Sequence, residues 1–423
     1  MTAPSFTLPH LGGSAFINTL KQTEASMDLR LPQDLSLTEQ RVFLRCDLNV
    51  PLKDGGIQDA SRIQAALPTI DYLIEHGCSI VLASHLGRPK SGFESLFSLT
   101  PIVHYLQGRG YDVHPDPFSP WEETRQRAER LKPGQILLLE NLRFYPGETK
   151  NDPTLGQFYA SLAPFYINDA FGAVHRAHAS VVSALSHFKT DNIAAGFLIE
   201  KEIQGLNQIL NPKKPLVCIF GGSKIGDKIS LIQQFINRAE HILIGGAMAY
   251  AFLKAQGIST GDSLIHEGSV EQAEEILKLL TSSSTQLHLP MDHLVSPPRG
   301  SQVLASITDG SEIPEGRKAL DIGPETIASY SEIISQASTI LWNGPMGWFE
   351  EAAYATGTLS MAEQIALRCT NGAYAAVGGG DSLAAVNLAG VANQISHMST
   401  GGGASLEYLS GIQLPGLTNL IKH

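Results

Sequence analysis

Short apolar runs recur along this chain, and each is followed by a polar or glycine-rich turn. In the first half the runs cover 41–46, 79–84, 136–139 and 165–167, and in the second half 216–220, 241–244, 286–289, 339–342 and 373–377. Short apolar strands that alternate with helix-like stretches are typical of parallel sheets covered on both faces. Two such series predict an α/β chain with two doubly wound, Rossmann-like domains, joined by a hinge helix across a cleft.

The composition is that of a globular protein with room for two domains. The chain has 423 residues, of which 43% are hydrophobic and 17% charged, enough for two domains of roughly 200 residues each. Its formal net charge of -11 disfavours nucleic acid as a partner, although local basic clusters can still bind an anionic substrate. Because no apolar run reaches the ~18 residues of a membrane span, we expect no membrane partner.

The cysteines and the first residues bear on the compartment. The four cysteines lie far apart with no CxxC pair, which suggests neither a zinc site nor a disulfide framework and favours a cytoplasmic location. Residues 1–26 lack a basic start followed by an apolar core, and they lack the arginines of a transit peptide. We expect them to form a disordered extension, with Met27 as a candidate initiator.

The boundary between the two series falls near residue 196. Residues 198–210 read LIEKEIQGLNQIL, which has the apolar spacing of an amphipathic helix. We therefore expect an N-terminal domain, a hinge helix, a C-terminal domain and a final segment, which cover 27–196, 197–210, 211–398 and 399–423. A helix between two domains can act as a hinge when they close.

The turns that follow the strands differ in kind between the two halves. The carboxyl ends of parallel strands meet at one edge of a sheet, where open α/β sheets bind their ligands. In the first half these turns supply charged and polar side chains, namely Asp47, Asn49, His85, Arg88 and Arg143. In the second half they supply glycines, at 221–222, 245–246 and 378–380. Arginine suits phosphate or carboxylate, and glycine turns suit the backbone cradling of a polyphosphate.

Each of these residues also has a structural interpretation. Asn, Asp and Gly end strands in most proteins, Arg62 at a helix start is more often a surface side chain, and a loop histidine such as His85 is more often structural. The stretch HRAHAS at 175–180 does not match a metal motif such as HExxH. Any single turn can be explained in this way, but the sorting of charge by domain cannot.

The stretch LVCIFGGSKIGDKI at 216–229 combines a strand, a glycine turn and an expected helix. Gly221 and Gly226 have the spacing of a Walker loop, but Asp227 stands where its lysine would be, so the match is weak. Lys224 and Lys228 are four residues apart, and a helix would place both on one face. A phosphate site and a turn with two solvated lysines are equal alternatives here.

Two glycine triplets each stand before an expected helix, at 378–380 and at 401–403. Asp381 follows the first triplet, where it either caps the helix or binds Mg²⁺ beside phosphates, since hard cations prefer oxygen ligands. One triplet could be a flexible loop, but two at helix starts favour the binding of an anion by backbone N–H groups.

Nine motifs together carry a resemblance to a known family. In chain order they are RVFLRCDLNVPL, SHLGRP, LLLENLRFYPGE, NDAFGAVHRAHAS, FGGSKIGDKI, ALDIGPET, WNGPMGWFE, GGGDS and STGGGASLEYLSG. From about residue 29 onward the chain resembles the phosphoglycerate kinases. It departs from their usual pattern at Leu48, where phenylalanine is usual, at Ser223, where alanine is usual, and at Trp348, where a smaller apolar residue is usual. None of these positions contacts phosphate in the family.

This resemblance implies a glycolytic enzyme that moves a phosphoryl group reversibly between 1,3-bisphosphoglycerate and ADP, giving 3-phosphoglycerate and ATP. It implies a monomer with the triose on the N-terminal domain, the nucleotide with Mg²⁺ on the C-terminal domain, and a final segment that returns to the N-terminal domain. The accepting carboxylate is already ionised at neutral pH, so no general base is required. Bending at the hinge helix would close the cleft and exclude water.

The resemblance also implies roles for individual residues. Those expected to hold the triose are Asp47, Leu48, Asn49, Arg62, His85, Leu86, Gly87, Arg88, Arg143 and Arg176. Those expected to hold the nucleotide phosphates are Lys224, Lys228, Gly379, Gly380, Asp381 (through Mg²⁺) and Ser382. The ribose is expected at Glu350, and the adenine slot at Gly245, Gly246 and Gly323. Those expected to stabilise the transferring group are Arg62, Lys224, Gly401, Gly402 and Gly403.

Two other functions stay open on the sequence. One is a kinase for a different small acyl phosphate, and the other is a non-catalytic nucleotide-binding protein retained for interactions. The joint presence of Arg62, Lys224 and Asp381 argues against the second, because a protein without turnover would tolerate their loss.

Overall fold

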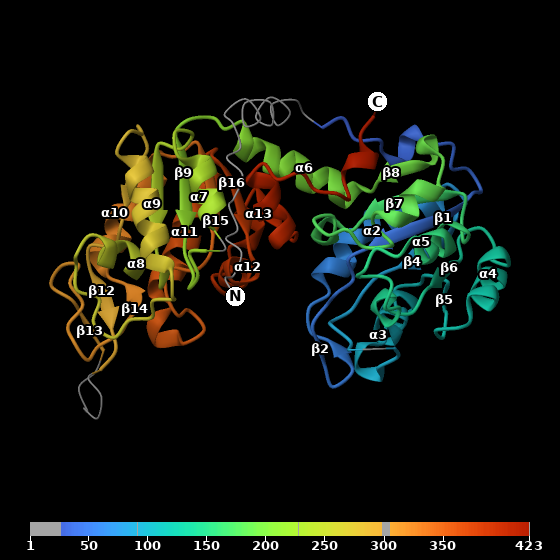
Figure 1. Ribbon diagram of the computed structural model, residues 1–423, viewed down its shortest axis with the longest axis horizontal. Helices are drawn as coiled ribbons and strands as arrows, with labels where there is room; N and C mark the ends of the chain where they lie inside the picture. The colour runs from blue at the N-terminus through green and yellow to red at the C-terminus, as the bar shows by residue number, and fades with distance from the viewer. Residues whose placement is uncertain (1–26, 91, 227, 298–304, 423) are drawn as a thin grey trace, which may run out of the picture.

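The structure is a computed structural model that describes residues 27–90, 92–226, 228–297 and 305–422. The extension expected over 1–26 lies outside these residues. Figure 1 shows two lobes joined by the long helix α6 (Phe197–Leu210), and each lobe is built around its own sheet. Within the described ranges, every helix is too short or too polar to span a bilayer.

Six parallel strands form the sheet of the N-terminal lobe, in the order β5-β6-β4-β1-β7-β8. Their bounds are Arg41–Cys46 (β1), Ser79–Ala83 (β4), Val113–Pro115 (β5), Ile136–Leu138 (β6), Phe165–Asp169 (β7) and Ile193–Ala195 (β8). The four runs expected from the sequence are strands here, with ends that agree within two residues. The sequence did not reveal β5 and β8, because VHP and IAA each hold only one large apolar residue, whereas the equally short β6 reads ILL.

Both faces of this sheet are buried, as the near-continuous apolar strands require. In β1, Phe43 belongs to one core cluster, whereas Val42 and Leu44 belong to another on the opposite face. This lobe also contains the α-helices α2 (Ser61–Glu75), α3 (Thr100–Gln107), α4 (Trp121–Glu129) and α5 (Pro153–Ala160), the hairpin of β2 (Leu52–Lys53) and β3 (Gly56–Ile57), and several short 3-10 helices.

The C-terminal lobe repeats this design with a second six-stranded parallel sheet, in the order β11-β10-β9-β15-β16-β17. Its strands are β9 (Leu216–Phe220), β10 (His241–Ile244), β11 (Gln286–His288), β15 (Thr339–Asn343), β16 (Tyr374–Gly378) and β17 (His397–Ser399). Its helices are α7 (Ile229–Phe235), α8 (Met248–Ala255), α9 (Ser269–Leu280), α10 (Pro324–Gln336), α11 (Thr356–Thr370), α12 (Gly380–Leu388) and α13 (Gly403–Leu409). Two doubly wound α/β lobes confirm the predicted fold class.

A small antiparallel sheet at the far end of this lobe was not expected. It has the order β13-β12-β14 and consists of β12 (His293–Val295), β13 (Ser306–Ile307) and β14 (Ala319–Ile322). These strands are short, and the longest lies directly before the GPET turn that opens α10. The strands read HLV, SI and ALDI, and none holds more than two consecutive large apolar residues, which is too little signal to predict a strand.

The helix expected to carry both lysines of the 216–229 stretch begins later than predicted. Helix α7 starts at Ile229, and Lys228 is its N-cap residue. Lys224 and Lys228 therefore lie in the loop between β9 and α7, and the prediction that one helix face holds both was wrong. Glycine at 226 disfavours a helix there, and residues 221–226 are irregular.

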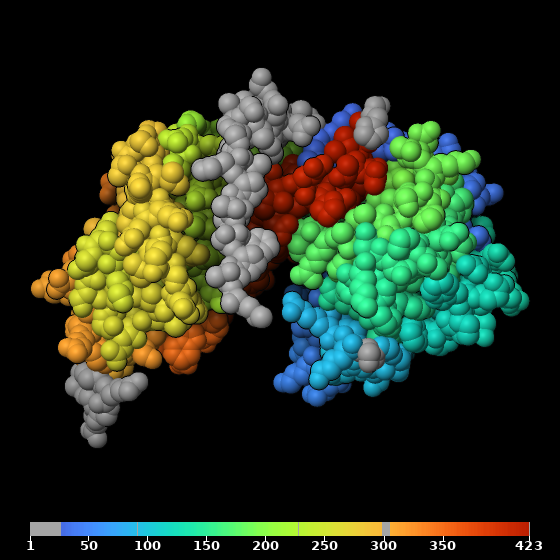
Figure 2. Space-filling view, in the orientation of Figure 1, coloured from blue at the N-terminus to red at the C-terminus, as the bar shows by residue number. Residues whose placement is uncertain are grey.

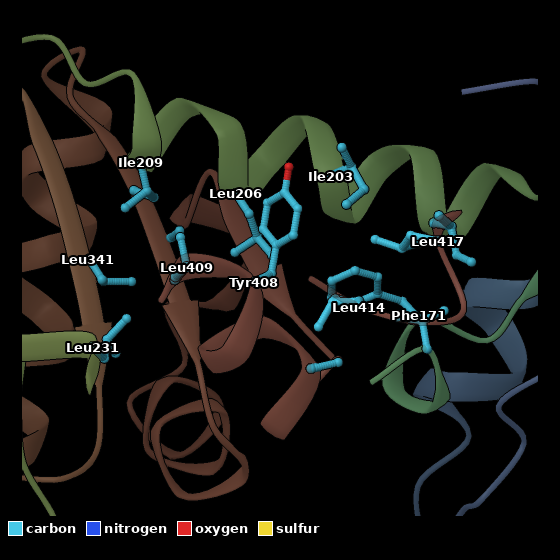
Figure 3. Packing of buried hydrophobic residues seen from close by; sticks show 14 of the residues in the cluster. Phe171, Ile203, Leu206, Ile209, Leu231, Leu341, Tyr408, Leu409, Leu414 and Leu417 are labelled. Carbon is cyan, nitrogen blue, oxygen red and sulfur yellow. The ribbon is translucent and has the colours of Figure 1, made fainter. Parts of the chain in front are cut away.

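Helix α6 packs its apolar side against the last part of the chain. Figure 3 shows side chains of α6 that point toward residues of α13 and of the segment beyond it: Ile203, Leu206, Ile209, Tyr408, Leu409 and Leu414. All six are buried. One core cluster thus continues from the C-terminal lobe along α6 to Phe171 and Leu417 beside the N-terminal lobe.

Polar contacts fasten the middle of α6 to the last strand of the C-terminal sheet. Oε2 of the buried Glu202 lies 3.0 Å from Nε2 of His397 in β17, and Oε1 accepts hydrogen bonds from the backbone N–H and the hydroxyl of Thr400. The hydroxyl of Tyr374 in β16 donates a hydrogen bond to the carbonyl oxygen of Gly205 at 3.0 Å. The helix is therefore bound to the chain that leads into the glycine triplet at 401–403.

The segment after α13 crosses to the N-terminal lobe. The N–H of Gly416 donates to the carbonyl of Val174, and the N–H of Arg30 donates to the carbonyl of Leu420. Leu29 and Ile421 form an isolated antiparallel bridge. The red end of the chain in Figures 1 and 2 accordingly runs from the left lobe to the right lobe.

We expect Gly205→Ala to destabilise the protein, although alanine is the better helix former. In an open helix interior the change would stabilise by about 1 kcal/mol. Here a methyl group would lie 2.5 Å from Nδ1 of His397, so β17 must move, at a cost of about 1–3 kcal/mol. Urea unfolding should show a net loss of about 1 kcal/mol. Gln208→Ala on the exposed side of α6 is the control, and a Gly205→Ala protein as stable as the wild type would contradict the packing argument.

Candidate active site

A basic cavity of about 280 Å³ lies at the strand ends of the N-terminal lobe. Its lining includes four arginines and three histidines, namely Arg62, Arg88, Arg143, Arg176, His85, His175 and His178. Asp47 is the carboxylate among the described residues that line it. Four guanidinium groups around one carboxylate leave an excess of positive charge, which fits a small ligand with several negative charges.

Turns after β1 and β4 hold this cavity in shape through contacts with each other. Oδ1 of Asn49 accepts the backbone N–H of Gly87 at 2.8 Å, and Arg143 donates to the carbonyl of Gly87 at 2.5 Å. Gly87 has φ +59, and a methyl group on it would lie 2.4 Å from the ring of Phe97. Only glycine fits this backbone, so the two turns and the arginine are fixed together.

Arg62 at the start of α2 is held by Asp47. Its Nη1 lies 2.6 Å from Oδ2 of Asp47, and 34% of the Arg62 side chain stays exposed against 8% for Asp47. Burial alone would raise the pKa of the Asp47 carboxyl, but the cationic groups around it, Arg62 and Arg45 among them, outweigh burial and lower that pKa. Asp47 thus stays ionised and aims the guanidinium of Arg62 at the cavity.

Arg45, which sequence reasoning missed, fixes the protonation of His85. Arg45 is 1% exposed, and its Nη2 lies 3.1 Å from Nδ1 of His85. Because a guanidinium can only donate, Nδ1 accepts and the proton of the neutral ring resides on Nε2. Burial, together with the nearby arginines, lowers the pKa of His85 well below its usual value. A charged residue within the buried run RVFLRC was the signal that could have found Arg45.

The second glycine triplet forms part of this same cavity. Gly401, Gly402 and Gly403 are among its lining residues, although they follow the last strand of the C-terminal sheet. Gly402 has φ +55, and a methyl group on Gly401 would lie 2.4 Å from the ring of Phe171. Backbone from the C-terminal part of the chain thus lies beside the arginines of the N-terminal lobe.

The strand ends of the C-terminal lobe form a groove with a polar half and an apolar half. The polar half, about 170 Å³, is lined by Gly222, Ser223, Lys224, Lys228, Asn343, Gly344, Pro345, Gly379, Gly380, Asp381 and Ser382. The apolar half, about 300 Å³, is lined by Tyr250, Leu264, Leu320 and Trp348 among others, with Gly246, Lys318 and Glu350. Four residues line both halves, which are therefore continuous: Gly222, Ser223, Pro345 and Asp381.

Hydrogen bonds between neighbouring turns hold the polar half in place. Nζ of Lys228 donates to the carbonyl of Gly221 at 2.7 Å. The hydroxyl of Ser382 accepts the N–H of Gly344 at 2.6 Å, and Asn343 donates to the carbonyl of Gly378 at 2.8 Å. The ends of β15 and β16 are thus joined to the start of α12, where Ser382 accepts the hydrogen bond.

Asp381 is suited to a magnesium ion that arrives with phosphates. Its carboxylate is exposed in the first turn of α12 and faces both halves of the groove. Among the described residues there is no group of three or more His, Cys, Asp or Glu that could hold a metal by itself. Mg²⁺ is usually held by one or two carboxylates together with substrate phosphates and waters, so a single carboxylate beside two lysines fits it.

Four of the expected site residues are not among the described residues that line the basic cavity or either half of the groove. Leu48 and Leu86 are buried beneath the turns, where their N–H groups donate to Ser84 and Asn141. Gly245 and Gly323 lie behind the groove: added methyl groups would meet Met346 at 2.4 Å and Asp292 at 2.3 Å. These glycines are required by close packing, so any contribution to a slot is indirect.

The histidines of the basic cavity should make the protein less stable in mild acid. Burial, then Arg45, Arg143 and Arg176, lower the pKa of His178 from 6.5 to about 4. Between these values the unfolded chain binds more protons, so the free energy of unfolding falls as the pH falls from 6.5 to 4.

The comparison of wild type with His178→Gln isolates this histidine from the carboxyl groups that titrate nearby. Below pH 6.5 the wild type should lose up to about 2 kcal/mol relative to the variant, in urea unfolding measured at pH steps from 7 to 4. A difference that stays constant with pH would mean that His178 is not held neutral.

Known proteins share both the sequence and the architecture of this chain. The sequence model of the family "Phosphoglycerate kinase" matches residues 32–412. The phosphoglycerate kinase of Moorella thermoacetica is 46% identical over 392 residues, covering 92% of this chain and 98% of that protein. The one from Koribacter versatilis is 44% identical over 398 residues, covering 92% and 98%.

Solved structures agree with the sequence relatives. The phosphoglycerate kinase of Coxiella burnetii superposes with a TM-score of 0.82 at 36% identity, covering 93% of this chain and 98% of that one. That of Pyrococcus horikoshii gives a TM-score of 0.78 at 30% identity, with the same coverage of 93% and 98%. Motifs, architecture and relatives lead to one conclusion: the chain belongs to the phosphoglycerate kinase family.

Proposed function

We propose that this chain, as a member of that family, transfers a phosphoryl group reversibly between 1,3-bisphosphoglycerate and ADP, giving 3-phosphoglycerate and ATP. The observation that carries the proposal is a pair of cavities of different chemistry. One is lined by four arginines around one carboxylate, and the other by glycine turns and two lysines beside an exposed carboxylate. The first suits a small phosphorylated acid and the second suits a polyphosphate chain.

The triose is assigned to the basic cavity. Arg88, Arg143 and Arg176 offer guanidinium forks to its phosphate, and neutral His85 offers the proton on Nε2. Asn49 and Gly87 hold the turn that presents these groups. Asp47 accepts hydrogen bonds from the hydroxyl groups of the substrate, and its ion pair with Arg62 orients that guanidinium.

The nucleotide is assigned to the groove of the C-terminal lobe. Lys224, Lys228 and the backbone of Gly379 and Gly380 line the half that suits the phosphates. Glu350 lines the apolar half, where its carboxylate can accept hydrogen bonds from the ribose hydroxyl groups. Gly246 lines the base slot, and Gly245 and Gly323 support it from behind.

Magnesium is assigned to Asp381, whose carboxylate borders both halves of the groove. When bound, the ion supplies positive charge that neutralises the nucleotide phosphates during transfer. Lys224 lies in the same half of the groove and adds a second positive charge there.

The chemical step requires charge stabilisation and orientation. The attacking carboxylate of 3-phosphoglycerate needs no base, because it is ionised at neutral pH. Arg62, Lys224 and the backbone of Gly401, Gly402 and Gly403 surround the space through which the phosphoryl group passes when the lobes meet. Donors fixed in this way typically lower a barrier by several kcal/mol.

Closure of the lobes follows from ligands held on separate sheets. We assign the triose domain to 27–196, the hinge helix to 197–210, the nucleotide domain to 211–398 and the returning segment to 399–423. Glu202 binds Thr400 next to the glycine triplet, so a movement of α6 would displace residues 401–403 directly. Closure excludes water, which would otherwise accept the phosphoryl group.

We propose that the protein acts as a monomer in the cytoplasm. Both cavities are formed within one chain, so the reaction needs no second copy and we propose a monomer. All four cysteines are free thiols, and three are buried, which suits a reducing compartment.

The proposed reaction is tested by ATP consumption with 3-phosphoglycerate, acetate or carbamate as the acceptor, on wild type and Arg62→Ala. We expect turnover with 3-phosphoglycerate alone. Arg62→Ala should lower kcat by about 10²–10³, with a smaller change in KM, since its charge acts on the transferring group. The Arg62→Lys variant can keep the ion pair with Asp47 but lacks the guanidinium fork. Its kcat should lie between those of the wild type and Arg62→Ala.

Arg109→Ala is the matched control, because Arg109 stacks on Tyr105 away from both cavities. Turnover with acetate or carbamate would point to another acyl phosphate kinase. Purified wild type that binds nucleotide without any turnover would support the non-catalytic alternative.

We also expect small-angle scattering to show compaction only when both substrates are bound. The radius of gyration should decrease with 3-phosphoglycerate and an unreactive ATP analogue together, and stay near the free value with either one alone, because each ligand occupies its own lobe. No compaction in the ternary complex would refute closure about α6.

A further inference from the structure

Two histidines contact each other on the C-terminal sheet, outside both cavities. Nδ1 of His241 in β10 lies 3.0 Å from Nε2 of His288 in β11, and the ring centroids are 5.1 Å apart with an angle of 47° between the ring planes. Neither histidine is among the described residues that line the basic cavity or either half of the groove. The proposed reaction therefore gives this pair no role.

The pairing of the strands brings the two rings together. In the parallel pairing of β10 with β11, His241 stands opposite Gln286, and Leu243 stands opposite His288. Paired residues of neighbouring strands, and residues two apart on one strand, have their side chains on the same face of a sheet. Both imidazoles therefore leave one face as diagonal neighbours, and the amide of Gln286 leaves the same face.

Tyr330 of helix α10 holds the backbone of both strands at this place. Its buried hydroxyl lies 2.8 Å from the carbonyl oxygen of Ile244 in β10 and 3.0 Å from the carbonyl oxygen of His288 in β11. The hydroxyl has a single proton, which the two carbonyls share. Although β11 is the edge strand of the sheet, the backbone that carries His288 is thus fixed from two sides.

A contact between two imidazole nitrogens can be a hydrogen bond or the place of a metal ion. In the hydrogen bond, one nitrogen donates its proton and the other accepts it. In a metal site, both nitrogens offer lone pairs to one ion, and at about 2.0–2.1 Å from a tetrahedral Zn²⁺ they lie about 3.3–3.4 Å apart. The rings would have to part by only a few tenths of an ångström. The donor ring would move its proton to its other nitrogen, so no net proton is released and the ion keeps its charge.

We propose that His241 and His288 form a binding site for a divalent transition-metal ion such as Zn²⁺, which links the edge strand β11 to β10. Imidazole nitrogen suits Zn²⁺, Ni²⁺ and Cu²⁺, whereas Mg²⁺ and Ca²⁺ prefer oxygen ligands. Both rings are partly exposed, which gives the ion a path from solvent. This site is separate from the Mg²⁺ assigned to Asp381 and does not depend on the proposed reaction.

The number of protein ligands sets the strength of this site. Within the described ranges, no group of three or more His, Cys, Asp or Glu could hold a metal, so the two imidazoles act without a third such ligand and water completes the coordination. Structural zinc sites have four protein ligands. Binding at the histidine pair is therefore weaker and reversible, and a chelator should remove the ion without unfolding the chain.

Calorimetric titration of the full chain with ZnCl₂ tests the pair, at about pH 7.5, where free histidine with its pKa of about 6.5 is neutral. Outer-shell partners of metal ligands alone are worth about 10–100-fold in affinity, so His241→Gln or His288→Gln should each raise the Kd for Zn²⁺ by at least about tenfold. The double variant should bind no more weakly than either single variant, because a chelating pair acts as a unit. Excess MgCl₂ should not displace the Zn²⁺.

His114→Gln is the matched control. His114 also belongs to an edge strand, β5 of the other sheet, and its Nε2 lies 2.9 Å from a carboxylate oxygen of Asp112. This variant should keep the wild-type affinity for Zn²⁺. Zn²⁺ should also raise the urea midpoint of the wild type and of His114→Gln, but not that of His288→Gln, since an ion bound to the native chain stabilises it.

Anomalous diffraction from wild-type crystals soaked in ZnCl₂ gives a second test that needs no variant. We expect a peak at about 2.0–2.1 Å from both Nδ1 of His241 and Nε2 of His288. The inference would be overturned by a Zn²⁺ affinity that is unchanged in both single variants, or by anomalous peaks at other histidines only. Losses that add up in the double variant would also overturn it, because they would mean two independent histidines.

Discussion

The packing of the last part of the chain on α6 determines where the site can form. Without it, the two sheets would be independent α/β lobes with unrelated strand ends. Buried residues of α13 and of the segment beyond it cover the apolar side of α6, while Glu202 binds both His397 and Thr400. This brings Gly401–Gly403 into the basic cavity of the other lobe. The same apolar contact that stabilises the bridge therefore assembles a cavity from two distant parts of the sequence.

Electrostatics in that cavity depend on buried partners. Arg45 lies inside β1, donates to Ser180 and reaches Nδ1 of His85, while Ser180 donates to the buried Glu148. A buried charge must be compensated, and here the hydrogen bond to Ser180 links Arg45 to the carboxylate of Glu148. Its consequence is that the histidines stay neutral and the positive charge is permanent, because it comes from guanidinium groups. The positive charge that the cavity offers is then insensitive to pH near neutrality.

Sequence reasoning succeeded where a signal extends over several residues. Strands of five or more residues, such as β1 and β9, were predicted, because a run of apolar residues ended by polar or glycine turns is distinctive. Three-residue strands such as β5 and the antiparallel β12 were missed, since tertiary pairing determines them. The sorting of arginines and glycines by lobe was visible because strand ends are local. The role of Arg45 was not, because it depends on partners 40 and 135 residues away.

The two ends of the nucleotide groove differ in how much change they can tolerate. Where phosphates are expected, part of the wall is tightly packed backbone: methyl groups on Gly221 or Gly344 would lie within 2.7 Å of neighbouring backbone oxygens, so these two positions permit no side chain. Where the base is expected, the walls are exposed side chains on a turn that β14 holds in place. Changing such a side chain alters the ligand surface and leaves the backbone as it is. A large indole at 348 is therefore compatible with an unaltered backbone at the polar half of the groove.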